Sequence, residues 1–285
     1  MDKKNKVSVI IPVYNDAEFL FDTIQSVVNQ TFDNWEIVIV DDGSTDEATI
    51  RIINDIEQKL KKIRVIHTIN GGPARARNLG IEQANGEYIL PLDADDLIYP
   101  TYIEKAIDII EHNNDIGIVY CEAEFIGKKS GKWDLPKYDL LTMLYTNVIF
   151  VTALFRKKDW YLVGGFDESL KNGIEDYDFW LALIERDRKV YQIPEVLFQY
   201  RIKEVSRTTL FMADKDKYLQ TYKQIVNNHR ELYQKHFDKI LYIYKEKEIE
   251  LNTKTERIKK LFPGYNFVNN NMKLKNILKK ILRIN

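Results

Sequence analysis

Short apolar runs alternate with stretches of helical periodicity over the N-terminal third of the chain. The runs are rich in Val, Ile and Leu, which predicts strands covered on both faces; they lie at 7–11, 35–40, 64–67 and the start of 87–96. Between them, apolar residues recur at helical spacing over 16–30 and 49–60, and a further helix opens within 70–80. Strands that alternate with helices predict an α/β fold with a parallel sheet.

The rest of the chain is less regular. It predicts further helices at 100–112 and 175–186, a hairpin turn at 127–131, and strands at 116–126, 148–156, 190–193 and 197–202. From about residue 215 the pattern becomes helical, charged and poor in Gly. We therefore expect one domain over 1–212, with halves at about 1–98 and 99–212, and a helical extension over 213–285.

Composition narrows the class of protein. Hydrophobic residues make up 45% of the 285 residues, which is enough for a core, and the net charge of −1 gives no basic field for nucleic acid. The chain has one Cys, which argues against a disulfide framework. Its first residues show no apolar segment typical of a signal peptide, and no apolar run approaches the length of a membrane span. These features predict a cytoplasmic protein.

Acids follow the predicted strand at the start of 87–96. Asp93, Asp95 and Asp96 would repel one another unless a cation lay among them, and Mg²⁺ or Mn²⁺ prefers such oxygen ligands. The alternative is a turn in which one Asp caps the helix near Pro100. Because one Asp would suffice for a cap, the pattern favours the ion.

Polar residues also follow the first two strands, namely Asn15 and the pair Asp41–Asp42. The carboxyl ends of parallel strands meet at one edge of a sheet, where ligands bind. We expect a nucleotide there. The sequence lacks a G-x-G-x-x-G fingerprint after the first strand and a P-loop, which argues against a dinucleotide-dependent dehydrogenase and a P-loop ATPase.

Several motifs occur in a fixed order: VSVIIPVYN (7–15), VDDGSTD (40–46), ARN (76–78), LDADD (92–96), GGFD (164–167) and EDYD (175–178). In order and spacing they resemble the family 2 glycosyltransferases of bacterial surface-polysaccharide synthesis, over roughly residues 6–206. The resemblance implies the GT-A fold, a mixed and mostly parallel sheet flanked by helices. It also implies transfer of a sugar from a nucleotide diphosphate, most simply a UDP-sugar, to a hydroxyl group.

The resemblance also assigns residues on the donor side. The nucleotide and its diphosphate would contact Pro12, Tyr14, Asn15, Asp42, Arg75, Arg77, Asp93 and Lys203. Asp42 would accept a hydrogen bond from the uracil edge, and Asp93 would bind the ribose. Asp95 would bind Mn²⁺ or Mg²⁺ on the diphosphate, helped by Asp93 and Asp96, although Asp96 could instead cap a helix. One Arg could contact the base or a phosphate while the other holds Asp93 or Asp95 in place, and for either Arg alone a surface salt bridge is an equal alternative.

For the chemical step, the resemblance places the base that deprotonates the acceptor in the pair Glu175–Asp176, with Asp176 the better candidate. A single displacement would invert the anomeric centre. The alternative is that both acids simply begin a helix, where the dipole favours carboxylates. Acceptor contacts are expected from 125–165, where Trp133, Asn147, Thr152 and Trp160 are candidates.

One position departs from the family pattern. Many relatives carry a metal-binding His where Lys203 stands, and a protonated Lys cannot bind a metal. Lys203, with Arg201 or Arg207, could neutralise the diphosphate instead, or it could be a solvated loop residue. In the functional interpretation, residues 203–212 form a lid.

The C-terminal segment 270–285 is basic, with apolar residues on one helical face. This pattern predicts peripheral contact with an anionic bilayer and a lipid-linked acceptor, with a frayed tail or partner-docking helix as alternatives. The extension could also pair with a second copy of the chain. Two other functions remain open: a sugar-1-phosphate nucleotidyltransferase and a non-catalytic sugar-nucleotide-binding protein.

Overall fold

The computed structural model describes residues 6–59, 62–171, 173–204 and 206–261. The chain divides into two compact units, residues 1–233 and residues 234–285. The first unit therefore includes residues 213–233, which the sequence assigned to the extension. The second unit contributes one described helix of its own, which is largely exposed.

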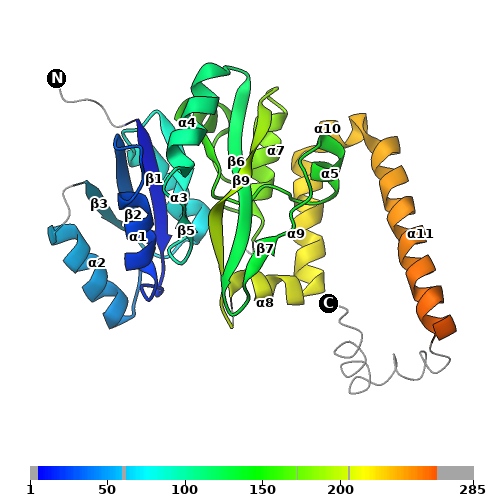
Figure 1. Ribbon diagram of the computed structural model, residues 1–285, viewed down its shortest axis with the longest axis horizontal. Helices are drawn as coiled ribbons and strands as arrows, with labels where there is room; N and C mark the ends of the chain where they lie inside the picture. The colour runs from blue at the N-terminus through cyan, green and yellow to red at the C-terminus, as the bar shows by residue number, and fades with distance from the viewer. Residues whose placement is uncertain (1–5, 60–61, 172, 205, 262–285) are drawn as a thin grey trace. The chain divides into compact units, whose positions relative to one another are not determined.

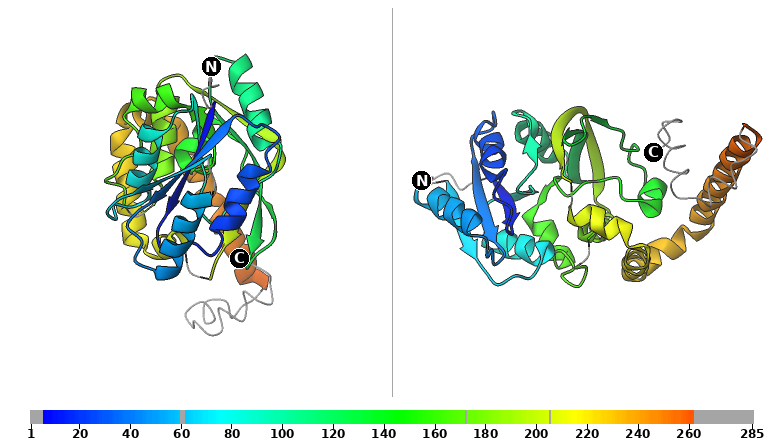
Figure 2. Two further views of the ribbon diagram at one scale, coloured as in Figure 1. Left: turned by 90° about the vertical axis from the view of Figure 1, so that its left-hand side faces the viewer. Right: turned by 90° about the horizontal axis from the view of Figure 1, so that it is seen from below.

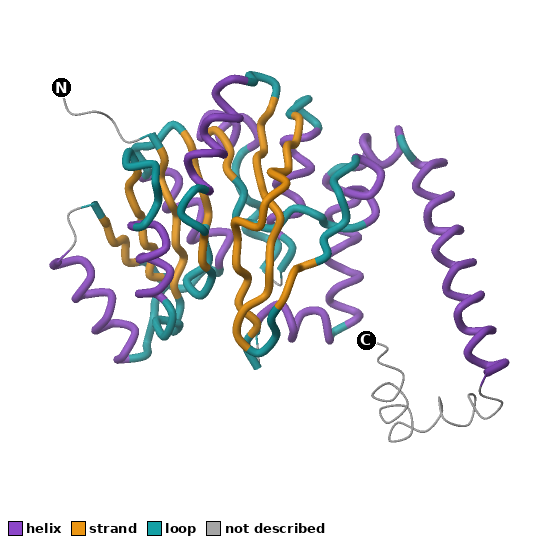
Figure 3. Tube along the Cα trace, in the orientation of Figure 1, coloured by secondary structure: helices purple, strands orange, loops and turns teal. Residues whose placement is uncertain are grey.

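A mixed sheet of nine strands runs through the first unit (Figures 1 and 3). Its main path has the order β3-β2-β1-β4-β8-β6-β9-β5, and β7 pairs with β6. The strands are β1 (Val7–Val13), β2 (Trp35–Asp41), β3 (Ile63–His67), β4 (Tyr88–Pro91), β5 (Leu97–Ile98), β6 (Ile116–Gly127), β7 (Gly131–Trp133), β8 (Leu154–Arg156) and β9 (Lys189–Ile202).

Strands β1 to β4 form the parallel half that the apolar runs predict, because β1 pairs in parallel with β2 and β4, and β2 with β3. Strand β8 is antiparallel to both β4 and β6, and β9 is parallel to β6. Because β8 runs opposite to β4 and β6 runs opposite to β8, β6 and its parallel partner β9 run in the same direction as β4. The carboxyl end of β9 therefore lies at the same edge of the sheet as those of β1, β2 and β4.

Helices cover both faces of this sheet (Figure 2). In α1, Leu20, Thr23, Ile24 and Val27 are buried, the stripe expected of a helix packed on one side. The helices are α1 (Leu20–Val28), α2 (Glu47–Lys59), α3 (Pro73–Gln83), α4 (Tyr102–His112), α5 (Leu140–Tyr145), α6 (Lys157–Val163), α7 (Glu175–Ile184), α8 (Arg207–Ala213), α9 (Lys215–Asn228), α10 (Arg230–Lys235) and α11 (Phe237–Leu261). None of these described helices is long and apolar enough to cross a membrane.

The predicted fold class is confirmed, and the differences are local. Of the run 148–156, only Leu154–Arg156 forms a strand, while the preceding apolar residues line a pocket. Strand β1 also continues through Pro12, where the sequence predicted that it ends. The partner strand β4 stops opposite Ile10, so the missing N–H of Pro12 interrupts no ladder on that side.

Helix α9 is tied to α7 by a buried imidazole. His229, directly after α9, lies between the carboxylates of Asp178 (Nε2–Oδ1 3.2 Å) and Glu185 (Nδ1–Oε2 3.0 Å). Burial lowers the pKa of His229, but hydrogen bonds to the two acids outweigh it and raise the pKa to about 9. The imidazolium therefore fixes α7, the helix that begins with Glu175 and Asp176.

This pairing predicts a pH-dependent stability. A pKa raised from 6.5 to about 9 gives stability that is fully present below pH 6.5 and is lost as the pH rises through 9. We expect His229→Gln to lower the melting temperature at pH 6 and to differ less from wild type at pH 10. The exposed His112 on α4 supplies the control, since His112→Gln should change neither melting temperature. Equal destabilisation by His229→Gln at both pH values would contradict the charged pairing.

Candidate active site

A buried guanidinium lies at the centre of the candidate site. Arg77, on α3, is 2% exposed and donates to Asp93 (Nη2–Oδ1 2.6 Å) and Glu175 (Nη1–Oε1 2.7 Å). Burial opposes its charge, yet the two carboxylates outweigh burial and keep the pKa of Arg77 above its usual value. Arg77 thus joins the turn after β4 to the first residue of α7.

Glu175 is the buried partner of two guanidinium groups. Besides Arg77, it accepts a hydrogen bond from Arg207 at the start of α8 (Nη2–Oε1 2.8 Å). Burial raises its pKa, but Arg207 and Arg77 outweigh burial and hold the pKa of Glu175 below its ordinary value. Glu175 is therefore ionised and committed to these contacts, which makes it a poor candidate for accepting a proton.

Asp176 has the opposite electrostatic environment. Its carboxylate accepts from its neighbour's backbone (Tyr177 N–Oδ1 2.8 Å) and from Asn147 (Nδ2–Oδ2 3.3 Å). Burial, followed by the charge of Glu175, raises the pKa of Asp176 to about 7. A carboxyl group with that pKa can accept a proton near neutral pH.

Asp176 faces a pocket of about 290 Å³. One wall is aromatic: Trp133 lies 5.2 Å from Tyr200 and 6.1 Å from Phe150 between ring centroids, and Phe150 stacks on Phe198 at 4.4 Å. The wall combines β7, β9 and the loop before β8. Of the acceptor candidates, Trp133 and Asn147 line this pocket, whereas Trp160 donates to Asn78 and Thr152 is buried.

The predicted nucleotide side lies along the ends of β1 and β2. Asp42 is buried and its two carboxylate oxygens accept from the backbone N–H groups of Gly71 and Gly72, each at 2.8 Å. Tyr14 is 50% exposed beyond the end of β1, and Pro12 is partly buried within that strand.

Two other predicted donor residues have structural partners. Asn15 has a positive φ of 49° and accepts from the backbone N–H groups of Thr45 (2.8 Å) and Asp46 (2.9 Å), so it shapes the loop before α2. Arg75 donates to the carbonyl of Ile69 (3.1 Å). Arg77, by contrast, is the residue that holds Asp93 in place.

The acids predicted to bind a metal each have protein partners. Asp93 pairs with Arg77, and Asp95 pairs with Lys203 (Nζ–Oδ2 2.7 Å). Asp96 is buried and accepts from the backbone N–H of Arg201 (2.8 Å), so it anchors β9 to this turn. Among the residues that the structure describes, no group of three or more His, Cys, Asp or Glu is arranged to hold a metal ion. The residues as arranged do not fit a divalent cation.

Two participants were missed or placed differently by sequence reasoning. Asp16 pairs with Lys203, although the sequence predicted only that a helix begins at that position. Asn147 was considered for the acceptor, and it donates to Asp176. An acid directly after the first strand is a signal that could have identified Asp16, whereas nothing local identifies the partner of Asn147.

The family follows from comparison with known proteins. The profile described as "Glycosyl transferase family 2" matches residues 8–165, which run from the second residue of β1 to beyond β8 and include most of the acids described above. This chain belongs to glycosyl transferase family 2. The family members are enzymes of sugar transfer, so the protein is a glycosyltransferase.

Two bacterial relatives agree with this assignment. An uncharacterized glycosyltransferase of Rickettsia typhi is 34% identical over 229 residues, which cover 74% of this chain and 69% of the relative. An uncharacterized glycosyltransferase of Haemophilus influenzae is 36% identical over 184 residues, which cover 63% of this chain and 72% of the relative.

A solved structure shares the fold. The crystal structure of Staphylococcus aureus TarS 1–349 in complex with UDP-GlcNAc matches with a TM-score of 0.65 and 24% identity, covering 78% of this chain and 66% of that chain. At that identity the match supports the fold alone, and the fold is the predicted GT-A type.

The central Arg77 gives a stability prediction. Arg77→Ala would leave Asp93 and Glu175 without their shared cation, and breaking a buried ion pair in this way costs about 3–5 kcal/mol. We expect a loss of that size in the free energy of unfolding by urea. Arg75→Ala on the same helix is the matched control and should cost about 0.5 kcal/mol or less. A loss below 1 kcal/mol for Arg77→Ala, roughly the value of an exposed pair, would contradict the central role.

Proposed function

We propose that this glycosyltransferase inverts the anomeric centre while it moves a sugar from a UDP-sugar to a hydroxyl of a saccharide or lipid-linked saccharide in surface glycan synthesis. One observation carries the proposal: Asp176 has a pKa of about 7 and faces the aromatic pocket, beside a Glu175 that is locked by two guanidinium groups. The pair thus contains one carboxylate free to accept a proton and one that is not.

The donor nucleotide is assigned to the ends of β1 and β2. Asp42 is held by two backbone N–H groups, and each of its carboxylate oxygens keeps a lone pair that can accept a further hydrogen bond from a base edge. Tyr14, which is half exposed, can cover the face of that base. A uracil base is supported by the shared fold with TarS, whose structure holds UDP-GlcNAc.

The chemical step is a single displacement. The oxygen of the acceptor hydroxyl forms a bond to the anomeric carbon as the bond from that carbon to the β-phosphate oxygen breaks. The bonding electrons leave with UDP, and the hydroxyl proton moves to the carboxylate of Asp176. Asn147 orients that carboxylate, while Glu175 stays ionised and raises its basicity.

The acceptor is assigned to the aromatic pocket. Aromatic rings such as those of Trp133 and Tyr200, whose centroids lie 5.2 Å apart, suit the apolar face of a pyranose ring. The basic segment 270–285, which motivates the lipid-linked acceptor and the contact with a bilayer, lies outside the described residues. Peripheral membrane contact, a cytoplasmic location and pairing through the extension therefore stay predictions.

The family assignment does not support the two alternative functions that the sequence left open. A nucleotidyltransferase or a non-catalytic binder would not be expected to belong to a family of sugar-transferring enzymes. The donor base, the acceptor and the stereochemistry are the parts of the proposal that experiment must decide.

Asp176→Asn tests the base. The amide cannot accept the proton, so we expect transfer to fall by about 10²–10⁴-fold while donor binding is kept, as measured by UDP-sugar titration and product formation. The solvated Asp108 supplies the control, because Asp108→Asn changes a 72% exposed side chain on α4 and should leave transfer unaltered. Normal transfer by Asp176→Asn would place the base elsewhere.

The pH profile provides a second test of the same residue. Asp176 must be ionised to act as a base, so kcat/KM should rise as the pH increases through about 7 and reach a plateau above it. A rate controlled by an ordinary carboxylate would already be on its plateau at pH 5.5. A profile that is flat between pH 5.5 and 8 would therefore exclude Asp176 as the group that limits the rate.

A further inference from the structure

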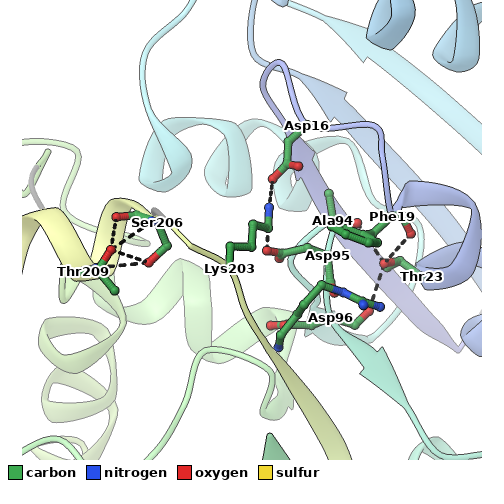
Figure 4. A network of polar contacts seen from close by, with 10 residues as sticks. Asp16, Phe19, Thr23, Ala94, Asp95, Asp96, Lys203, Ser206 and Thr209 are labelled. Atoms are coloured by element: carbon green, nitrogen blue, oxygen red, sulfur yellow. Dashed lines mark hydrogen bonds and ion pairs between the residues drawn. The ribbon is translucent and has the colours of Figure 1, made fainter. Parts of the chain in front are cut away.

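The side chain of Lys203 occupies the position between the carboxylates at the strand ends. Lys203 directly follows β9, and its ammonium pairs with Asp95 (Nζ–Oδ2 2.7 Å) and with Asp16 (Figure 4). Asp16 follows β1 and Asp95 follows β4, so one cation bridges two neighbouring strand ends. The Lys203 side chain is only 23% exposed, which distinguishes it from a solvated loop lysine.

The backbone around this ammonium is held in place. The hydroxyl of Thr23 on α1 lies 2.9 Å from the carbonyl oxygens of both Ala94 and Asp96 and shares its one hydrogen between them, which fixes the turn that carries Asp95. Asp96 accepts from the backbone of Arg201, which fixes the end of β9 two residues before Lys203. Both backbone segments that carry the ion pair are therefore fixed, and the ammonium is held in a defined position.

Electrostatics keep this lysine charged. The ammonium of Lys203 is paired with two carboxylates, those of Asp16 and Asp95. Lys203 therefore places a positive charge between these two acids. A divalent ion that approached Asp95 would meet this charge at close range and would have to compete for the same carboxylate oxygen.

The neighbouring acids do not provide another site for a divalent ion. Asp93 is engaged by Arg77, and Asp96 is buried against the backbone of Arg201. The sequence-based expectation that Asp95, Asp93 and Asp96 hold Mn²⁺ or Mg²⁺ therefore conflicts with the partners that these side chains have in the structure.

We propose that Lys203 is the resident cation of the donor site and that its ammonium, in place of a divalent ion, neutralises the donor diphosphate. The inference rests on the proposed function, because it takes the ligand to be a nucleoside diphosphate. In the bound state the ammonium shares its donors between Asp95 and a phosphate oxygen, as its three N–H groups permit. Donor binding is then independent of divalent ions.

The test is titration calorimetry on the full chain. UDP, with GDP, ADP and dTDP in parallel, is titrated in EDTA and again in Mn²⁺ or Mg²⁺. We expect wild-type protein to bind UDP in EDTA with an affinity within about twofold of that in Mn²⁺. Loss of one charge-assisted hydrogen bond predicts that Lys203→His weakens binding in EDTA by about tenfold or more. Mn²⁺ should restore binding in this variant, since His can bind a metal beside Asp95.

Lys189→His is the matched control. Lys189 forms an ion pair with a single Asp, Asp115 (Nζ–Oδ2 2.6 Å), at the exposed start of β9. Its replacement should change neither the affinity for UDP nor the response to Mn²⁺. Melting temperatures of both variants confirm that they are folded.

The possible results distinguish the role of Lys203 from the proposed function of the protein. Wild-type binding that requires Mn²⁺ or Mg²⁺, or Lys203→His that binds as wild type does in EDTA, would overturn the role of Lys203 and leave the glycosyltransferase proposal intact. Binding of GDP, ADP or dTDP in place of UDP, still without metal, would overturn the uracil assignment and support Lys203. Failure of every nucleoside diphosphate to bind under both conditions would overturn both.

Discussion

The candidate site depends on one buried guanidinium. Burying the charge of Arg77 carries a desolvation penalty of several kcal/mol, which only well-placed counter-charges offset. Asp93 and Glu175 supply them, and they come from separate elements, the turn after β4 and the start of α7. Because of this penalty, moving either element away from Arg77 would destabilise the folded protein. The proposed donor half and acceptor half are thereby held in one fixed geometry.

The same pairing divides the work between two adjacent acids. Glu175 is bound by Arg77 and Arg207, so its pKa lies low and its charge is constant. That constant charge, together with burial, raises the pKa of its neighbour Asp176 to about 7. Two carboxylates of similar intrinsic acidity thus become a fixed anion and a proton acceptor, because environment and not residue type sets their pKa values.

Cations of the chain itself balance the acids at the carboxyl edge of the sheet. Lys203 bridges Asp16 and Asp95, as Arg77 bridges Asp93 and Glu175, and each of these cations comes from a segment distant in sequence from its acids. An edge rich in carboxylates is therefore stable without a ligand. It is also prepared for an anionic one, because a diphosphate can take donors from a lysine whose charge is already in place.

The sequence by itself determined the parallel half of the sheet, the family and the residues that gather at the strand ends, because apolar periodicity and motif order are local properties. It could not assign the separate roles of Arg75 and Arg77 or choose between the interpretations of Lys203. It favoured Asp176 over Glu175 only through the family resemblance. It also began a strand at residue 148, whereas in the structure residues 148–151 line a pocket and the strand starts at Leu154. These matters depend on burial and on partners such as Asp16 and Asn147, which are distant along the chain. Only the tertiary structure brings such groups to within hydrogen-bonding distance, and that proximity decides which acid holds a charge and which accepts a proton.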